Sequence, residues 1–91
     1  MTQKLLHRTT ATVRNPKGLH MRPLSEIVRK AQSFRGELFV CRGTIRADAK
    51  SLLHLMTLGA EVGTQLEVEA VGVDGHSAVN QLAEVIETEF E

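Results

Sequence analysis

Aromatic and sulfur-containing residues are scarce in this 91-residue chain, which has no Trp, no Tyr, three Phe and one Cys. With so few aromatic rings, the sequence lacks the platforms on which proteins stack single-stranded nucleic-acid bases. Cys41 stands alone, so neither an intramolecular disulfide framework nor a metal site built from several cysteines can form. The chemistry of this chain must therefore rest on other residue types.

An excess of one charge and long apolar runs are also absent. Eleven Lys and Arg residues balance eleven Asp and Glu residues, so the chain lacks the basic surplus of proteins that bind nucleic acid through counterion release. No apolar run approaches the roughly 20 residues of a membrane-spanning helix, and residues 1–17 are too polar for a signal peptide. We therefore expect a cytoplasmic protein that neither enters a membrane nor binds nucleic acid.

The overall composition is that of a small globular protein, with 42% hydrophobic and 24% charged residues. These proportions supply one modest core, and chains this short are rarely divided. We expect residues 1–91 to form a single domain.

Alternation of apolar and polar residues predicts four strands. The first covers residues 8–14, and residues 37–46 predict two short strands joined by a turn at 42–44. The last covers residues 65–72 and is expected to have one wet face. Its buried face would carry Leu66, Val68 and Ala70, and its wet face Glu67, Glu69 and Val71.

Three segments carry apolar residues at helical spacing. The first follows Pro23 and has Leu24, Ile27, Val28 and Ala31 on one face. The second is short, begins after Ser51 and stops near Gly59. The third begins after Asp74, a good N-cap, and its buried stripe consists of Ala78, Val79, Leu82, Ala83, Ile86 and Phe90. The order β-α-β-β-α-β-α predicts an α+β fold, an open-faced β-sandwich in which three helices cover one face of a four-stranded antiparallel sheet.

The most informative segment joins the first strand to the first helix and reads Gly18-Leu19-His20-Met21-Arg22-Pro23-Leu24. Pro23 suits the first turn of a helix, so we expect the helix to begin between Met21 and Pro23. His20 would then lie at a helix N-terminus, where backbone N–H groups and the positive end of the dipole attract an anion of phosphate size. That field also favours the neutral imidazole, and Arg22 adds a forked donor. These are the parts of a phosphohistidine site, although the residues alone also fit a simple helix cap beside a solvated arginine.

Two motifs carry a resemblance to a known family. The segment GLHMRPL at residues 18–24 resembles the GLHxRPA signature of HPr, the histidine phosphocarrier of the bacterial phosphoenolpyruvate-dependent sugar phosphotransferase system. The segment KSLLHLMTLG at residues 50–59 resembles the KSxxxxxxLG segment around the regulatory serine of that family. The resemblance covers roughly residues 9–90, and the family has the same β-α-β-β-α-β-α open-faced sandwich.

The resemblance implies a phosphoryl-group carrier that forms a phosphohistidine and needs no cofactor, and not a turnover enzyme. His20 would accept a phosphoryl group on Nδ1 from Enzyme I and pass it to the A component of a sugar permease, while Arg22 would contact the phosphate. Met21 and Leu24 depart from the small residue and the alanine usual in the family. Both add bulk beside the site, which would alter partner preference without removing the chemistry.

The second helix has more apolar residues than one stripe can bury. At about 100° per residue, Leu55 and Leu58 point one way, while Leu52, Leu53 and Met56 occupy a separate arc. We expect Leu55 and Leu58 in the core and the other three in an exposed patch, which usually marks a partner site. The resemblance supports docking here beside the active histidine, with Met21 as a further docking residue. A fully buried helix is the alternative.

Ser51 has two interpretations. It suits the N-cap of the second helix, and its match to the regulatory serine makes it a candidate substrate of HPr kinase/phosphorylase. A phosphate there would suit the helix dipole but would place about −2 charge on the docking patch, so transfer from Enzyme I would weaken. Two alternatives therefore stay open: a paralogue of the nitrogen-related phosphotransfer branch, or a binding regulator controlled through Ser51.

Metal binding and hydrolysis find little support in the sequence. His7, His54 and His76 lack metal-site spacing with His20, and no glycine pattern of a nucleophile elbow surrounds Ser51. Cys41 alternates with Val40, so packing is its expected role. Nothing in the sequence requires a dimer, and we expect a monomer.

Overall fold

The computed structural model describes residues 5–90. This part of the chain contains four strands and three helices. In chain order they are β1 (Leu6–Thr12), α1 (Met21–Ala31), β2 (Glu37–Arg42), β3 (Ile45–Asp48), α2 (Leu52–Met56), β4 (Gln65–Val71) and α3 (Gly75–Glu87). The order predicted from the sequence is confirmed.

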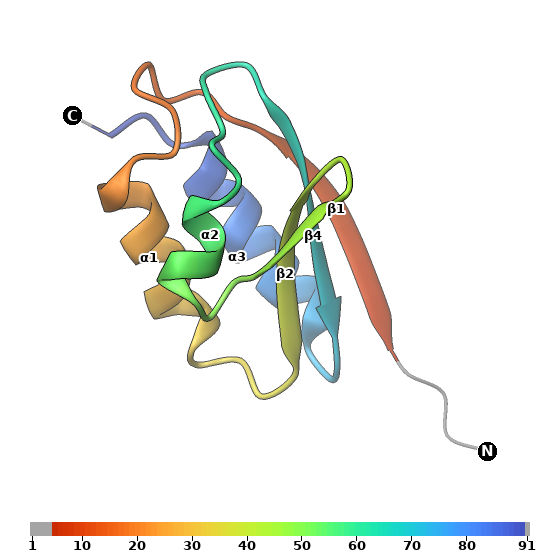
Figure 1. Ribbon diagram of the computed structural model, residues 1–91. Helices are drawn as coiled ribbons and strands as arrows, with labels where there is room; N and C mark the ends of the chain where they lie inside the picture. The colour runs from red at the N-terminus through yellow and green to blue at the C-terminus, as the bar shows by residue number, and fades with distance from the viewer. Residues whose placement is uncertain (1–4, 91) are drawn as a thin grey trace.

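The four strands form one antiparallel sheet in the order β1-β4-β2-β3. In its register, Val68 of β4 lies between Thr9 of β1 and Val40 of β2. The three helices cover one face of this sheet, and the other face is open (Figure 1). The open-faced sandwich predicted from the sequence is therefore confirmed.

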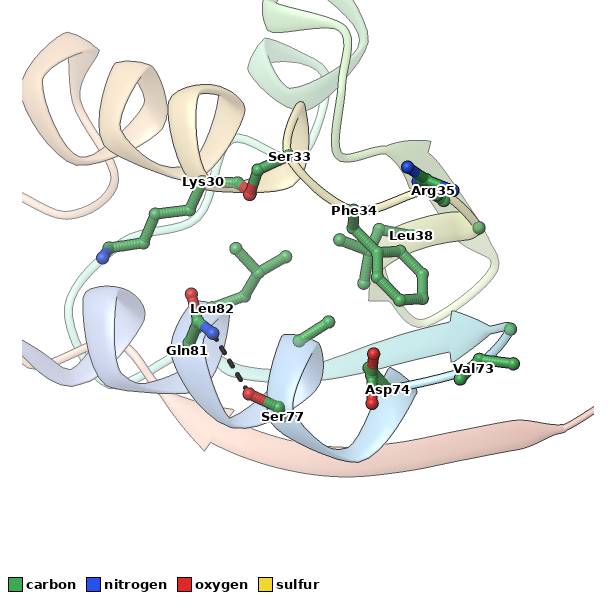
Figure 2. Close-up of a pocket in the computed structure, with 13 residues that line it drawn as sticks. Lys30, Ser33, Phe34, Arg35, Leu38, Val73, Asp74, Ser77, Gln81 and Leu82 are labelled. Atoms are coloured by element: carbon green, nitrogen blue, oxygen red, sulfur yellow. Dashed lines mark hydrogen bonds between the residues drawn. The ribbon is translucent and has the colours of Figure 1, made fainter.

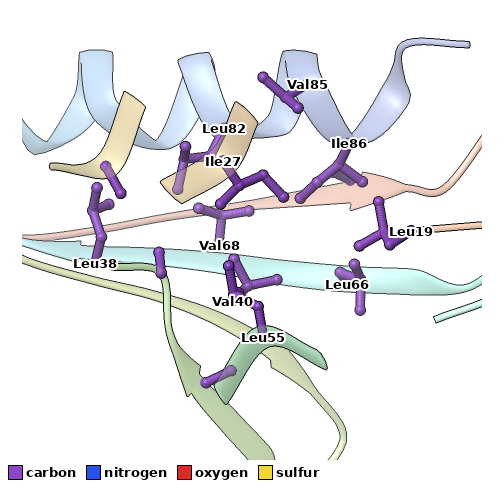
Figure 3. Packing of buried hydrophobic residues seen from close by; sticks show 14 of the residues in the cluster. Leu19, Ile27, Leu38, Val40, Leu55, Leu66, Val68, Leu82, Val85 and Ile86 are labelled. Carbon is purple, nitrogen blue, oxygen red and sulfur yellow. The ribbon is translucent and has the colours of Figure 1, made fainter. Parts of the chain in front are cut away.

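The core lies between the sheet and the helices (Figure 3). Because successive side chains of a strand point to opposite faces, alternate residues of β2 and β4 reach the helices. Each helix adds one buried stripe to this layer. Fully buried members of the core include Leu38 and Val40 of β2, Leu66 and Val68 of β4, Ile27 of α1, Leu55 of α2, and Leu82 and Ile86 of α3.

Two expectations about the strands need correction. β1 covers Leu6–Thr12 and not residues 8–14, because Val13 leaves the ladder and exchanges hydrogen bonds with the turn before β4, where its N–H donates to Thr64 O at 2.9 Å. Glu69 was expected on a wet face but is only 8% exposed. Its carboxylate lies 3.1 Å from Arg8 Nε and 3.2 Å from Arg46 Nε, and the two long arginine side chains cover it.

The final helix differs from its prediction at both ends. Asp74 occupies the N-cap position, but its backbone is left-handed (φ 67°) and its side chain makes no capping hydrogen bond. Helix α3 ends at Glu87, so Phe90 packs against the core from the segment beyond the helix. Val85 is buried although the predicted stripe omitted it.

Candidate functional site

His20 occupies the N-cap of α1, as the sequence predicts. Its backbone is extended (φ −82°, ψ −172°), and its carbonyl oxygen accepts the first intrahelical hydrogen bond from Leu24 N at 3.1 Å. Pro23 is buried in the first turn, which contains no acidic residue. The position therefore combines a nucleophilic side chain with the positive end of an 11-residue helix.

The loop before His20 is fixed by contacts with the turn that follows α2. Gly18 has a positive φ of 70°, and a Cβ atom at this position would lie 2.6 Å from the carbonyl oxygen of Ala60. Leu19 N donates a 2.9 Å hydrogen bond to the same oxygen. Only glycine permits both the conformation and the close approach, so the glycine of the motif sets where His20 lies.

Asn15 ties this loop to the C-terminal segment. The residue is fully buried, its Nδ2 donates to Gly18 O at 3.0 Å, and its Oδ1 accepts from Phe90 N at 2.8 Å. This role was not predicted from the sequence, where residues 15–18 only mark a break after the first strand. The order Asn-Pro-Lys-Gly was an available signal, because Asn at the first position and Gly at the fourth are typical of a tight turn.

The two nitrogens of the His20 ring are not equivalent. Nε2 is buried and has no hydrogen-bond partner among the described residues. A nitrogen without accessible surface cannot attack an incoming phosphorus atom while the ring keeps this orientation. Phosphoryl chemistry at His20 would therefore use Nδ1.

Arg22 lies in the first turn of α1, two residues after His20. Its guanidinium carbon lies 5.5 Å from the centre of the Phe90 ring, a distance that permits a cation–π interaction. The surrounding sequence is basic, since Arg14 and Lys17 precede His20 and the first acidic residue of the chain is Glu26. The sequence neighbours of His20 therefore carry basic charge and no acidic charge.

The predicted docking residues are exposed with one exception. The exposed fractions are 51% for Met21, 78% for Leu53 and 50% for Met56. Leu52 is only partly exposed and packs against the core, which corrects its assignment to the exposed arc. The helices α1 and α2 that carry these residues pack against each other on the same face of the sheet (Figure 1).

Ser51 is the N-cap of α2, as predicted, and its Oγ accepts a hydrogen bond from His54 N at 3.2 Å. Leu55 and Leu58 are buried as expected. The predicted site residues thus fall in two groups, with His20 and Arg22 at the start of α1 and Ser51 at the start of α2.

Comparisons with known proteins agree on one family. Residues 7–88 match the model of the family described as "PTS HPr component phosphorylation site". The phosphocarrier protein HPr of Haemophilus influenzae is 42% identical over 71 residues, which cover 78% of this chain and 84% of that protein. This chain belongs to the HPr family. HPr of Treponema pallidum is 34% identical over 82 residues, which cover 90% of this chain and 93% of that protein.

The solved structures agree with this assignment. HPr-C-His from Thermoanaerobacter tengcongensis has a TM-score of 0.82 and 30% identity, and the match covers 88% of this chain and 90% of that chain. As an HPr, the protein is a phosphocarrier of the phosphotransferase system that drives sugar transport. Members of this family are carriers and not enzymes.

Two basic side chains, for which the sequence predicted no role, fix segments next to α2 in this HPr. Lys50 Nζ donates to the carbonyl oxygens of Phe34 at 2.7 Å and Gly36 at 3.0 Å. Arg42 donates to the carbonyl oxygens of Leu58 at 2.9 Å and Gly59 at 2.8 Å. The lysine of the KS motif therefore fixes the loop after α1, next to the Ser51 cap.

A cavity of about 800 Å³ lies at the opposite end of α1 from His20 (Figure 2). Its floor includes Leu38 and Leu82, and polar side chains of α1 and α3, among them Lys30 and Gln81, stand at its sides. None of the predicted site residues lines it. Within residues 5–90, no group of three or more His, Cys, Asp or Glu could hold a metal ion, and no helix is long and apolar enough to cross a membrane.

Proposed function

We propose that this HPr accepts a phosphoryl group on Nδ1 of His20 from phosphorylated Enzyme I and passes it to the A component of a sugar permease. In each transfer the bond between phosphorus and the donor atom breaks as the bond to the acceptor atom forms. The observation that carries the proposal is His20 at the N-cap of α1 with Nε2 buried, because this leaves Nδ1 for the reaction. In the neutral ring the remaining proton stays on Nε2.

Arg22 and the start of α1 would stabilise the transferred group. The guanidinium supplies planar, charged donors for phosphate oxygens, and the helix start supplies backbone N–H groups and a positive dipole. A carrier must also release its phosphoryl group, so binding it more tightly than the transition state would slow the next transfer. A single arginine beside a helix start, away from the 800 Å³ cavity, suits that requirement.

Met21, Leu53 and Met56 would form the docking surface for both Enzyme I and the A component, with Leu52 at its buried edge. These three are among the few large apolar side chains with half or more of their surface exposed within residues 5–90. If both partners dock on this surface in turn, each must reach the same histidine, His20, from it. We further propose that the chain acts in the cytoplasm as one domain and as a monomer.

The direct test is the intact mass of the protein after incubation with phosphoenolpyruvate and purified Enzyme I. We expect the wild type to gain one phosphoryl group that acid removes, and His20→Ala to gain none. His76→Ala is the matched control, because His76 is an exposed histidine of α3 outside the site. An acid-stable adduct, or no adduct with the cognate Enzyme I, would refute the carrier proposal.

We also propose that phosphorylation of Ser51 by HPr kinase/phosphorylase weakens docking. Its Oγ already lies at the start of α2, next to Leu52 and Leu53. A phosphate would keep an acceptor for the His54 N–H but place charge beside an apolar surface. Ser51→Asp should raise the KM of Enzyme I for this HPr, whereas Ser51→Ala, which loses the cap, should lower stability by about 1 kcal/mol and leave the KM nearly unchanged. Equal KM values for both variants would exclude charge as the cause.

A further inference from the structure

We propose that Asn15 is a positioning residue for phosphoryl transfer, which places both His20 and Arg22 without touching the phosphate. This inference rests on the proposed function of His20. Asn15 lies five residues before His20, and its side chain is the only fully buried polar one among residues 5–90.

Both ends of the Asn15 amide have partners that lie far apart in the sequence. Nδ2 donates to Gly18 O at 3.0 Å, and Oδ1 accepts from Phe90 N at 2.8 Å, 75 residues away. The Asn15 carbonyl oxygen also accepts from Gly18 N at 2.8 Å. Only a side chain with a donor and an acceptor on one short branch can serve both partners, so this position requires an amide.

The hydrogen bond from Asn15 Nδ2 to Gly18 O affects the position of His20. Holding the Gly18 carbonyl fixes the turn in which Gly18 packs against Ala60 and Leu19 N bonds to Ala60 O. The His20 ring follows directly from this turn and has a buried, unpartnered Nε2. No hydrogen bond at Nε2 holds the ring, so the position of the backbone that Asn15 fixes contributes directly to where the ring lies.

The hydrogen bond from Phe90 N to Asn15 Oδ1 affects the position of Arg22. The bond from Phe90 N holds the C-terminal segment beside the loop, and the Phe90 ring lies 5.5 Å from the Arg22 guanidinium carbon. Asn15 therefore joins the segments that carry or contact the two groups proposed to act on one phosphoryl group. Misplacement of reacting groups by about 1 Å can lower a rate by roughly 100-fold, so a fixed loop has kinetic consequences.

The test compares single-turnover and steady-state transfer from Enzyme I to full-length variants. Asn15→Ala removes both hydrogen bonds, and Asn15→Asp keeps the acceptor for Phe90 N but faces the Gly18 carbonyl with an oxygen. We expect both to lower kcat by about 10- to 100-fold with little change in KM, because the docking residues are untouched. Val79→Ala, a core substitution in α3 away from the loop, is the control for lost stability.

A double-mutant cycle separates positioning from a merely structural role. Phe90→Leu keeps the backbone N–H that bonds Asn15 but removes the ring beside Arg22, so it should lower kcat less than Asn15→Ala. In the double variant with Asn15→Ala, Phe90→Leu should lower kcat little further, because Asn15→Ala has already released the segment that holds the Phe90 ring beside Arg22. A folded Asn15→Ala or Asn15→Asp with wild-type kcat, or a loss no larger than that of Val79→Ala, would overturn the inference. A wild type that accepts no phosphoryl group would instead overturn the proposed function.

Discussion

Gly18 packs so closely against Ala60 that any side chain at position 18 would overlap the Ala60 carbonyl oxygen, 2.6 Å from the Cβ position. This contact joins the loop of His20 to the turn after α2, and Leu19 N reinforces it with a hydrogen bond to the same oxygen. Backbone atoms therefore fix the loop of His20, the proposed transfer site, relative to the turn that follows α2, the helix with the proposed docking residues.

Gly18→Ala should destabilise the protein much more than Gly43→Ala. Both glycines have positive φ, 70° and 58°, but a Cβ at Gly43 meets nothing within 4 Å. Gly43→Ala should therefore cost only the left-handed conformation, about 1 kcal/mol, whereas Gly18→Ala adds the backbone overlap and should cost about 3 kcal/mol. Urea unfolding measures both, and equal losses would show that the Ala60 contact does not constrain the loop.

The fold could be predicted largely because its signals are local. The alternation in β4 and the 3.6-residue repeats in α1 and α3 depend on neighbours in sequence, and each element falls close to its predicted range. The errors arose where distant residues decide. Glu69 follows the polar alternation, yet arginines from β1 and β3 bury it.

In the candidate site, too, the features set by sequence neighbours could be predicted and the contacts between distant residues could not. His20 at a helix N-terminus could be predicted because Pro23 and the preceding turn are adjacent to it in the sequence. The bond between Asn15 and Phe90 spans 75 residues, and the contact of Phe90 with Arg22 depends on where the chain runs after α3. No periodicity encodes such contacts, so the sequence did not reveal them.

Lys50→Met should destabilise the protein although the side chain is near the surface. Lys50 Nζ satisfies the carbonyl oxygens of Phe34 and Gly36, and charged hydrogen bonds of this kind contribute about 1.5–3 kcal/mol. Lys17→Met is the matched control, because Lys17 is exposed and should change stability by less than about 0.5 kcal/mol. Equal Tm values for Lys50→Met and Lys17→Met in thermal unfolding would contradict this role of Lys50.

Leu53→Ala should affect docking and Leu55→Ala should affect stability, although both residues lie in α2. Leu53 is 78% exposed, so Leu53→Ala should change the free energy of unfolding by less than about 0.5 kcal/mol. It should nevertheless raise the KM of Enzyme I by about tenfold if Leu53 is an anchor of the docking surface. Leu55 is fully buried, and Leu55→Ala should cost about 2–5 kcal/mol. An unchanged KM for Leu53→Ala would remove this residue from the proposed surface.

Cys41 should make the protein less stable in alkaline solution. The thiol is buried in β2 on the open face of the sheet, and burial, reinforced by the Glu69 carboxylate, raises its pKa. A raised pKa means that the folded state keeps a proton that the unfolded state loses. The resulting stability is complete below the ordinary thiol pKa, about 8.5, and is lost as the pH rises through the higher value of the folded state.

Cys41→Ala tests this linkage, because it removes the thiol while the lysines that titrate in the same range remain. Between pH 8 and pH 10 the free energy of unfolding should fall more steeply for the wild type than for Cys41→Ala. Glu69→Gln should accelerate alkylation of Cys41 at a fixed pH, because losing the carboxylate lowers the pKa of the thiol. Parallel pH profiles for the wild type and Cys41→Ala would mean that the thiol ionises equally readily in the folded and unfolded states. Burial on the open face would then not control its reactivity.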